Sequence, residues 1–161
     1  MFLIKIWGYA YPYFFWGAID VPTTEKRVEQ MVGFLDLKSA KKAVDLGAGD
    51  GRLIIALADA GVEAHGYEIN PFLVLKARKN IREAGLEKKA FMHLKNLWRA
   101  DLAEFDVVVL YGMRHMMRKL EKKFEKELKP GVKIVSNYFT LPTWKPERVE
   151  DNICLYIKQQ A

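Results

Sequence analysis

The sequence of 161 residues contains a single cysteine, Cys154. One thiol excludes a disulfide framework and a cysteine-rich metal site within the chain, and no metal is expected. Its neighbours Ile153 and Leu155 are apolar, so the thiol is expected to be buried and inert within a strand. The single cysteine is therefore typical of a cytoplasmic protein.

No apolar run is long enough to cross a bilayer. The aromatic stretch IWGYAYPYFFWGAI, residues 6–19, is shorter than the roughly 20 residues of a spanning helix, and Pro12 interrupts it. It also lacks the aliphatic core and cleavage site of a secretory signal. Tryptophan and tyrosine favour the membrane–water boundary. Residues 1–20 are therefore interpreted as a segment that covers the following domain as a lid or contacts a membrane interface, and the two roles are compatible.

Residues 21–161 contain no repeats, long linkers or low-complexity stretches. At this length they predict one domain with a hydrophobic core. The formal net charge of +6 is compatible with anionic partners such as nucleic acid or a lipid surface. Most lysines and arginines stand beside glutamates in helical patterns, however, so solvated helix surfaces are the simpler interpretation of this charge.

Strand and helix patterns alternate along these residues. Strands are predicted at 42–46, 62–67, 89–93, 106–111 and 132–139, with a closing hairpin at 148–149 and 153–158. Helices are predicted to begin near residues 24, 52, 71 and 116. This order predicts an α/β fold with a doubly wound, mostly parallel, Rossmann-like sheet and an antiparallel closing hairpin. Ligands of such sheets bind at the carboxyl ends of the central strands.

A glycine-rich loop, residues 47–51, follows the first predicted strand. Glycines permit positive φ and let the backbone approach a ligand closely. The dinucleotide-binding pattern needs a glycine where Arg52 stands, and the lysine of a phosphate-binding loop is missing. Asp45, just before the loop, would repel a phosphate but suits an ammonium or sulfonium group. The loop is therefore interpreted as a site for S-adenosylmethionine.

Glu68 ends the second predicted strand, about 20 residues past the loop, where a carboxylate accepts hydrogen bonds from ribose hydroxyls. The alternative is that Glu68 only caps the next helix. Asn96, Leu97 and Trp98 follow the third strand, where this fold holds adenine. The alternative there is a plain turn with a core tryptophan.

At these residues the chain resembles the small seven-strand protein-lysine N-methyltransferases. That family includes the mitochondrial enzymes that modify the ADP/ATP carrier and the membrane ring of the ATP synthase and, more distantly, archaeal enzymes of broad specificity. The resemblance rests on residues 21–24, 44–52, 66–71, 97–98, 111–112, 116–117, 120–123 and 139–144. The chain departs from the mitochondrial members at Asn96, where they carry aspartate, and at Arg114, where they carry proline.

The resemblance implies a seven-strand class I methyltransferase domain over residues 21–161, with S-adenosylmethionine as cofactor. The implied cofactor contacts are Thr23, Thr24, Asp45, Gly47, Ala48, Gly49, Asp50, Glu68, Ile69, Asn96, Leu97 and Tyr111. Tyr111, Asn137 and Tyr138 end the fourth and fifth strands and are expected to face the methyl group as catalytic residues, with packing as the alternative. His65 and His93 fall within strands and are expected to be structural.

The expected substrate is a lysine side chain of a protein, with membrane proteins among the candidates. A nucleic-acid methyltransferase is the main alternative, followed by a small-molecule methyltransferase. Residues 110–113, LYGM, lack the motif for adenine or amide methylation, and the only cysteine is in the last strand, so nucleic acid is not expected as a partner. The protein is expected to be a cytoplasmic monomer, with peripheral membrane contact through residues 6–19 as an additional possibility.

Overall fold

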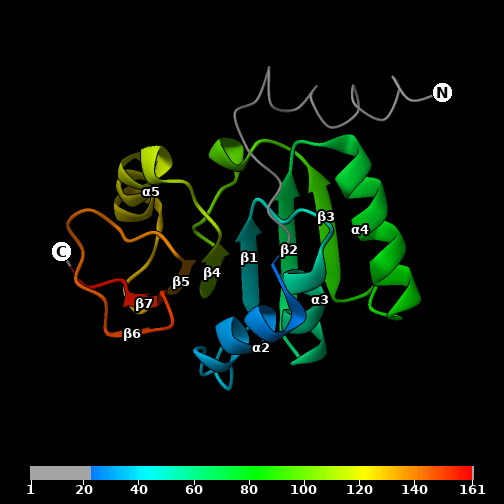
Figure 1. Ribbon diagram of the computed structural model, residues 1–161, viewed down its shortest axis with the longest axis horizontal. Coiled ribbons are helices and arrows are strands. Elements are labelled where there is room, and N and C mark those ends of the chain that lie inside the picture. Colours follow the sequence, from blue (N-terminus) through cyan, green and yellow to red (C-terminus); the bar gives the residue numbers. More distant parts are fainter. Residues whose placement is uncertain (1–22, 161) are drawn as a thin grey trace.

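The computed structural model describes residues 23–160 (Figure 1). The segment 1–20, interpreted above as a lid or a membrane contact, lies outside the described residues. In chain order, the described elements are α2 (Glu25–Gly33), β1 (Lys42–Leu46), α3 (Arg52–Asp59), β2 (Glu63–Glu68), α4 (Pro71–Glu83), β3 (Ala90–Leu94), the 3-10 turn η1 (Leu97–Arg99), β4 (Val107–Leu110), α5 (Arg114–Glu127), β5 (Lys133–Asn137), β6 (Arg148–Glu150) and β7 (Ile153–Ile157).

The strands form one sheet in the order β3-β2-β1-β4-β5-β7-β6. The first five strands in chain order pair in parallel, whereas β7 pairs antiparallel with both β5 and β6. The carboxyl ends of β1, β2 and β3 point to the top of Figure 1. The predicted fold, a doubly wound and mostly parallel sheet with an antiparallel closing hairpin, is confirmed.

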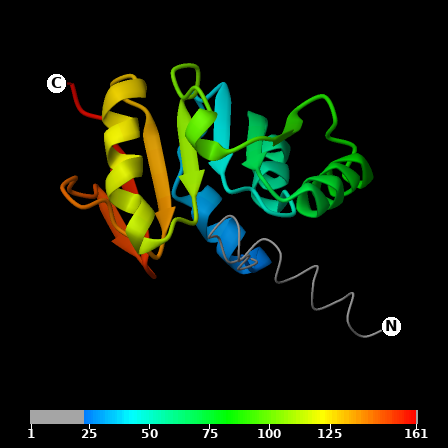
Figure 2. The same ribbon diagram turned by 90° about the horizontal axis from the view of Figure 1, so that it is seen from above.

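Two hydrophobic cores cover the two faces of the sheet. Helices α2, α3 and α4 pack on one face through side chains that include Met31, Ile54 and Ala77. Helix α5 packs on the other face through Leu120 and Phe124. Figure 2, seen from above, shows α2 and α5 well apart. Because the centre of the sheet is covered on both sides, β4 is a continuous apolar run, VVVL, rather than an alternating one.

Two element boundaries differ by two residues from the sequence prediction. The fifth strand ends at Asn137 rather than at residue 139, because Tyr138 adopts a left-handed conformation with φ of 67° and turns the chain away. Helix α5 begins at Arg114, two residues earlier than predicted. The turn given as the alternative at residues 96–98 is present as η1.

The hairpin of β6 and β7 braces the end of β5. Its turn residues, Asp151 and Asn152, have φ of 48° and 61°. The carbonyl of Asn152 accepts a hydrogen bond from the backbone amide of Tyr138 at 2.8 Å. Gln30 of α2 donates to the Asp151 carboxylate at 3.0 Å. The hairpin therefore fixes both α2 and the turn that follows β5.

Candidate active site

The carboxyl ends of four neighbouring strands bring polar side chains to one edge of the sheet. From β2 through β1 and β4 to β5, these residues are Glu68, Asp45, Tyr111 and Asn137. Side chains alternate between the faces of a strand. Ala43 and Val135 belong to the core beneath α2, α3 and α4, so Asp45 and Asn137, two positions later, face the same helices.

The glycine loop is held against the end of β2. Gly47, Gly49 and Gly51 all have positive φ, of 99°, 53° and 83°. The amides of Gly47 and Ala48 donate to the carbonyl of Tyr67 at 3.0 and 3.1 Å. No atom lies within 4 Å of the position where a Cβ of Gly47 would be. The loop thus combines a backbone that needs glycine with open space beside Gly47, which suits the close approach of a ligand.

Gly66, on β2 below the loop, is required by packing. A Cβ there would lie 2.6 Å from the Cβ of Ala48 and 2.5 Å from the sulfur of Met92. The missing side chain lets the loop lie directly on β2. Gly66 thereby brings the loop next to the carboxylate that ends the same strand.

The Glu68 carboxylate connects the loop to the turn before α4. One oxygen accepts from the amide of Gly49 at 3.1 Å. The other accepts from the amides of Ile69 and Asn70, both at 2.8 Å. The cap of α4 is Asn70, whose side chain accepts from the amide of Phe72. Glu68 is therefore not the helix cap, and its carboxylate is fixed at the edge with remaining acceptor capacity.

Asp45 is a buried carboxyl group without a cation. Its side chain is 5% exposed, and within residues 23–160 no donor forms a hydrogen bond to it. Burial, together with the nearby Glu68 carboxylate, raises the pKa of Asp45 to about 8. A positively charged ligand placed between these two carboxylates would reverse that shift.

Asp50 fixes the loop to two helices. Its carboxylate accepts from Arg52 of α3 at 2.9 and 2.7 Å and from Lys76 of α4 at 3.0 Å. The hydrogen bonds from Arg52 are the main cause that lowers the pKa of Asp50 to about 2. Asn80 also donates to the Asp50 carbonyl. The structure thus shows Asp50 in contacts that set the position of the loop.

Thr23 and Thr24 lead into α2. The Thr24 hydroxyl accepts from the amide of Arg27 and caps the helix. The Thr23 carbonyl accepts from Arg52 at 2.6 Å. Because Arg52 also binds Asp50, this contact links Thr23 to the glycine loop.

Tyr111 and Tyr138 lie together at the ends of β4 and β5, and Asn137 and Tyr138 share a companion that was not predicted, Arg27. The rings of Tyr111 and Tyr138 meet edge to face, with centroids 5.7 Å apart. Arg27 of α2 donates from Nε to Oδ1 of Asn137 at 2.7 Å, and its guanidinium lies 4.8 Å from the centre of the Tyr138 ring. One sequence signal could have found Arg27, because it precedes buried Met31 by four residues and so belongs to the apolar side of α2.

Asn96 precedes η1 beyond β3, and Leu97 and Trp98 lie within it. The Asn96 side chain accepts from the amide of Trp98 and caps this turn. Leu97 and Trp98 pack against the core on the α5 side, and Lys119 lies 4.3 Å from the centre of the Trp98 ring. Trp144 lies elsewhere, with its indole N–H on Glu125 and its ring near Lys158.

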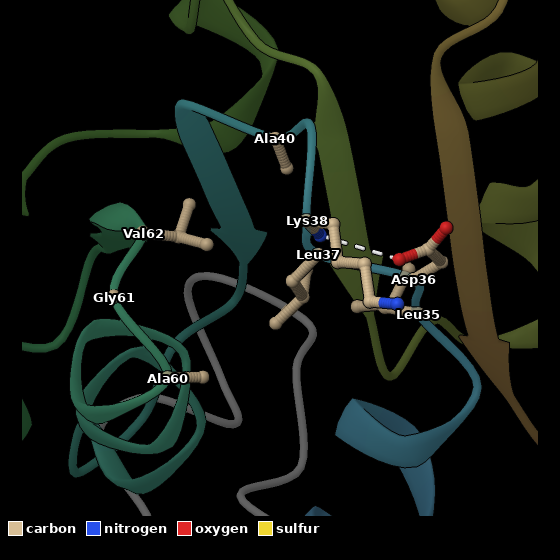
Figure 3. Close-up of a pocket in the computed structure, with 8 residues that line it drawn as sticks. All are labelled: Leu35, Asp36, Leu37, Lys38, Ala40, Ala60, Gly61 and Val62. Atoms are coloured by element: carbon tan, nitrogen blue, oxygen red, sulfur yellow. Dashed lines mark hydrogen bonds between the residues drawn. The ribbon is translucent and has the colours of Figure 1, made fainter.

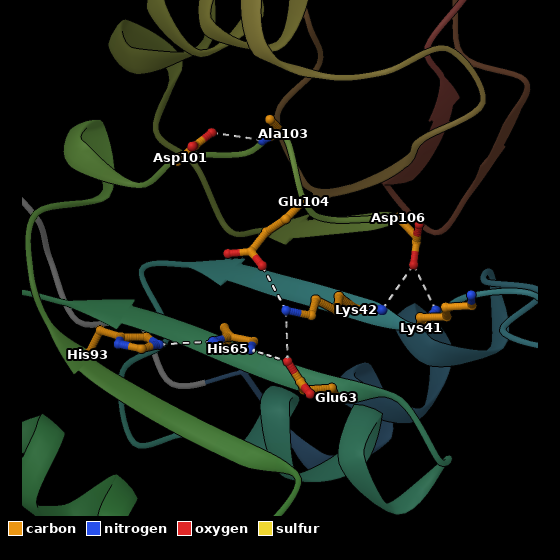
Figure 4. Close-up of polar contacts among 9 residues, drawn as sticks. All are labelled: Lys41, Lys42, Glu63, His65, His93, Asp101, Ala103, Glu104 and Asp106. Carbon is orange, nitrogen blue, oxygen red and sulfur yellow. Dashed lines mark hydrogen bonds and ion pairs between the residues drawn. The ribbon is translucent and has the colours of Figure 1, made fainter.

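The strand histidines lie on the opposite face, the face of α5. Nδ1 of His65 lies 3.0 Å from Nε2 of His93, and Nε2 of His65 lies 3.0 Å from Oε1 of Glu63 (Figure 4). Lys42 forms ion pairs with both Glu63 and Glu104. Burial is the main cause that lowers the pKa of His93. This network crosses the strands through their own side chains and has no part at the edge of Asp45.

Two other features lie outside the edge described above. A hollow of about 520 Å³ opens at the amino ends of the strands, lined by residues 35–38, 40 and 60–62 (Figure 3). Its position excludes it from the site at the carboxyl ends. In the part of the chain that the structure describes, no three His, Cys, Asp or Glu side chains are grouped so as to hold a metal ion.

Comparison with known proteins identifies relatives of this arrangement. The model of the ANTKMT methyltransferase domain matches residues 45–148. The chain is 37% identical to the adenine nucleotide translocase lysine N-methyltransferase of Mus musculus over 134 residues, which are 81% of this chain and 58% of the mouse protein. It is 37% identical to a protein-lysine N-methyltransferase of Saccharolobus islandicus, covering 80% of this chain and 81% of that protein.

A solved structure is also similar. It is that of an RNA methyltransferase from Salinibacter ruber in complex with S-adenosyl-L-homocysteine, with a TM-score of 0.84 and 34% identity over 88% of this chain and 95% of that one. The chain spans less than two thirds of the length of the mouse relative. The names of these relatives agree on methyl transfer and differ in the acceptor.

Proposed function

The chain belongs to the ANTKMT methyltransferase family, and we propose that it transfers a methyl group from S-adenosylmethionine to lysine side chains of proteins. The observation that carries the proposal is the buried carboxyl of Asp45 beside Glu68 at the glycine loop. The names of the mouse and archaeal relatives, both lysine N-methyltransferases, support the choice of acceptor.

The residues at the edge fit this cofactor. Glu68 has acceptor capacity for ribose hydroxyls, and within residues 23–160 no ion pair neutralises Asp45, which suits an ammonium and a sulfonium group. Gly47, Ala48 and Gly49 would lie along the ligand. The proposed neighbours of adenine are Ile69, Asn96 and Leu97. Thr23, Thr24 and Asp50 are proposed to hold the loop and α2 in place rather than to complement the charge of the cofactor.

The acceptor half of the site consists of Tyr111, Asn137 and Tyr138. When bound, the cofactor supplies a methyl group on a positively charged sulfur. The pKa of free lysine is about 10.4, so the protein must favour the neutral amine. The rings of Tyr111 and Tyr138 meet edge to face, and Tyr138 is 54% exposed, so one side of this aromatic wall is open to solvent. The two rings are therefore proposed to orient the amine while it loses its proton to solvent.

RNA is the second candidate acceptor, because helix α5 carries an exposed basic row. Arg114, Arg118, Lys122 and Lys126 follow one another at intervals of four residues and are all exposed. Like charges at this spacing destabilise a helix, whereas they suit a phosphate backbone. The name of the Salinibacter relative points the same way.

Transfer of labelled methyl groups into a cell lysate distinguishes the two acceptors. We expect the label to resist nuclease, to be removed by protease and to be found on lysine by mass spectrometry. The Glu68→Ala variant is the control for background labelling. Label found only in RNA, or only on arginine and glutamine, would reject lysine methylation and leave the methyltransferase activity in place.

The same edge also carries an apolar surface that suits a membrane. Phe72, Leu75 and Leu94 are 73%, 63% and 56% exposed, near the carboxyl ends of β2 and β3, and Lys79 and Lys95 lie beside them. Exposed rings and aliphatic groups flanked by lysine favour an anionic lipid interface. We propose that this surface docks on membranes, together with residues 6–19. None of the helices within residues 23–160 is long and apolar enough to span a bilayer.

Flotation with vesicles tests this docking surface. Replacing Phe72 and Leu75 together by serine is expected to weaken binding to phosphatidylserine vesicles roughly tenfold or more, because two apolar side chains that would be buried in the lipid are lost. Val149→Ser is the matched control, because Val149 is 57% exposed on β6, away from this edge. Equal binding by all three proteins, or no binding by the unaltered chain, contradicts the proposal.

A further inference from the structure

Arg27 carries a charge that nothing in the described structure neutralises. Its guanidinium contacts the amide oxygen of Asn137, the ring of Tyr138 and, at 3.5 Å, the amide oxygen of Gln30, all of which are neutral groups. No ion pair joins it to a carboxylate within residues 23–160. A half-buried cation in such surroundings is unfavourable unless an anion completes the site.

One nitrogen of this guanidinium is left over. Nη2 of Arg27 is buried and has no hydrogen-bond acceptor, the only such side-chain atom among the described residues. Buried donors are nearly always satisfied in folded proteins, and an unsatisfied one lowers stability. The oxygen of Asn137 already accepts from Nε, so Nη2 needs a further acceptor, and a ligand at this edge of the sheet would supply it.

The charges along the edge identify the chemistry of that ligand. Glu68 on β2 and Asp45 on β1 are acidic, whereas Arg27 lies over the end of β5, three strand intervals or about 14 Å from β2. A phosphate-rich ligand does not match this order, because the acids would repel it. A ligand that carries hydroxyls, then a cation, then a carboxylate along its length matches the order of Glu68, Asp45 and Arg27.

We propose that Nη2 of Arg27 binds the carboxylate of the amino-acid end of the cofactor, an inference that rests on the proposed function. Asn137 and the ring of Tyr138 hold the guanidinium before the ligand arrives, and a preorganised planar donor suits a carboxylate. Asn137 then acts as a positioning residue through Arg27. Arg27 selects ligands that keep the carboxylate.

Calorimetry with two ligands tests this assignment. S-adenosylhomocysteine and its decarboxylated analogue, 5′-S-(3-aminopropyl)-5′-thioadenosine, differ only in the carboxylate. The unaltered protein is expected to bind S-adenosylhomocysteine roughly 10- to 100-fold more tightly than the analogue. Arg27→Gln is expected to lose this preference by weakening the first ligand alone. Arg82→Gln, an exposed arginine at the far end of α4, is the matched control and keeps it.

The outcomes separate the two levels of inference. Equal weakening of both ligands in Arg27→Gln would make Arg27 a structural residue and overturn the assignment, as would unchanged affinity for S-adenosylhomocysteine. The assignment is equally overturned if the unaltered protein does not distinguish the two ligands. Binding of neither ligand by the unaltered, folded protein would instead reject the proposed cofactor itself.

Discussion

Replacing Glu68 by alanine is expected to weaken the binding of S-adenosylhomocysteine by at least about 30-fold. The variant loses the charge-assisted hydrogen bonds proposed for the ribose hydroxyls. It also releases the amide of Gly49, which the carboxylate holds at 3.1 Å, so the glycine loop is no longer fixed beside the ligand. Isothermal titration calorimetry measures the change directly.

Two further variants separate charge from position. Glu68→Gln keeps an acceptor for the loop amides and is expected to bind with intermediate affinity. Glu83→Ala removes an exposed carboxylate that pairs only with Lys79 on α4, and is expected to bind as the unaltered protein does. Unchanged affinity in a folded Glu68→Ala protein contradicts the ribose assignment.

Binding of the same ligand is expected to release close to one proton at pH 7. Asp45 has a pKa of about 8 in the free protein, so its carboxyl group is largely protonated at that pH. A cation bound beside it favours the carboxylate and lowers this pKa. Affinity should therefore rise with pH, roughly tenfold per unit between pH 6 and 7.5, as the proton to be displaced is lost.

Titrations in buffers of different ionisation enthalpy count the released proton. Asp45→Asn cannot ionise at this position, so its binding is expected to be weaker and to show neither proton release nor the rise with pH. A pH-independent affinity in the unaltered protein contradicts the role of Asp45. The free energy of unfolding without ligand depends on pH in the opposite direction. The protonated Asp45 contributes fully to this free energy below pH 3.8, its ordinary pKa, and the contribution is lost as the pH rises to about 8.

The fold could be predicted because its signals are local. The apolar run of β4 and the glycines after β1, α3 and α4 indicate the alternation of strand and helix, and handedness rules supply the sheet. The boundaries that differ depend on distant contacts. The end of β5 is set by the left-handed Tyr138, whose amide is held by Asn152 across the hairpin, and no local pattern reveals that bond.

The candidate site divides in the same way. Asp45 and Glu68 are readable from their positions at strand ends, and the structure places them side by side. The partners of Asp50 are not readable, since Lys76 reaches it from another helix. Arg27 was hidden for a related reason. Its spacing to Met31 places it on the apolar side of α2, but charged residues on amphipathic helices are usually solvated, and no local pattern shows that Asn137 lies opposite it.

The contacts of the β6–β7 hairpin also determine the order in which the two halves of the site form during folding. The strands β1 and β2 and the loop between them meet across short stretches of chain, whereas the contacts of α2 with Asn137 and Asp151 join residues 110 and 121 positions apart. Contacts that close such large loops are entropically disfavoured until the intervening chain has folded. A chain folding from its N-terminal side therefore holds a nucleoside-binding half first and gains its acceptor half only when the hairpin pairs with β5.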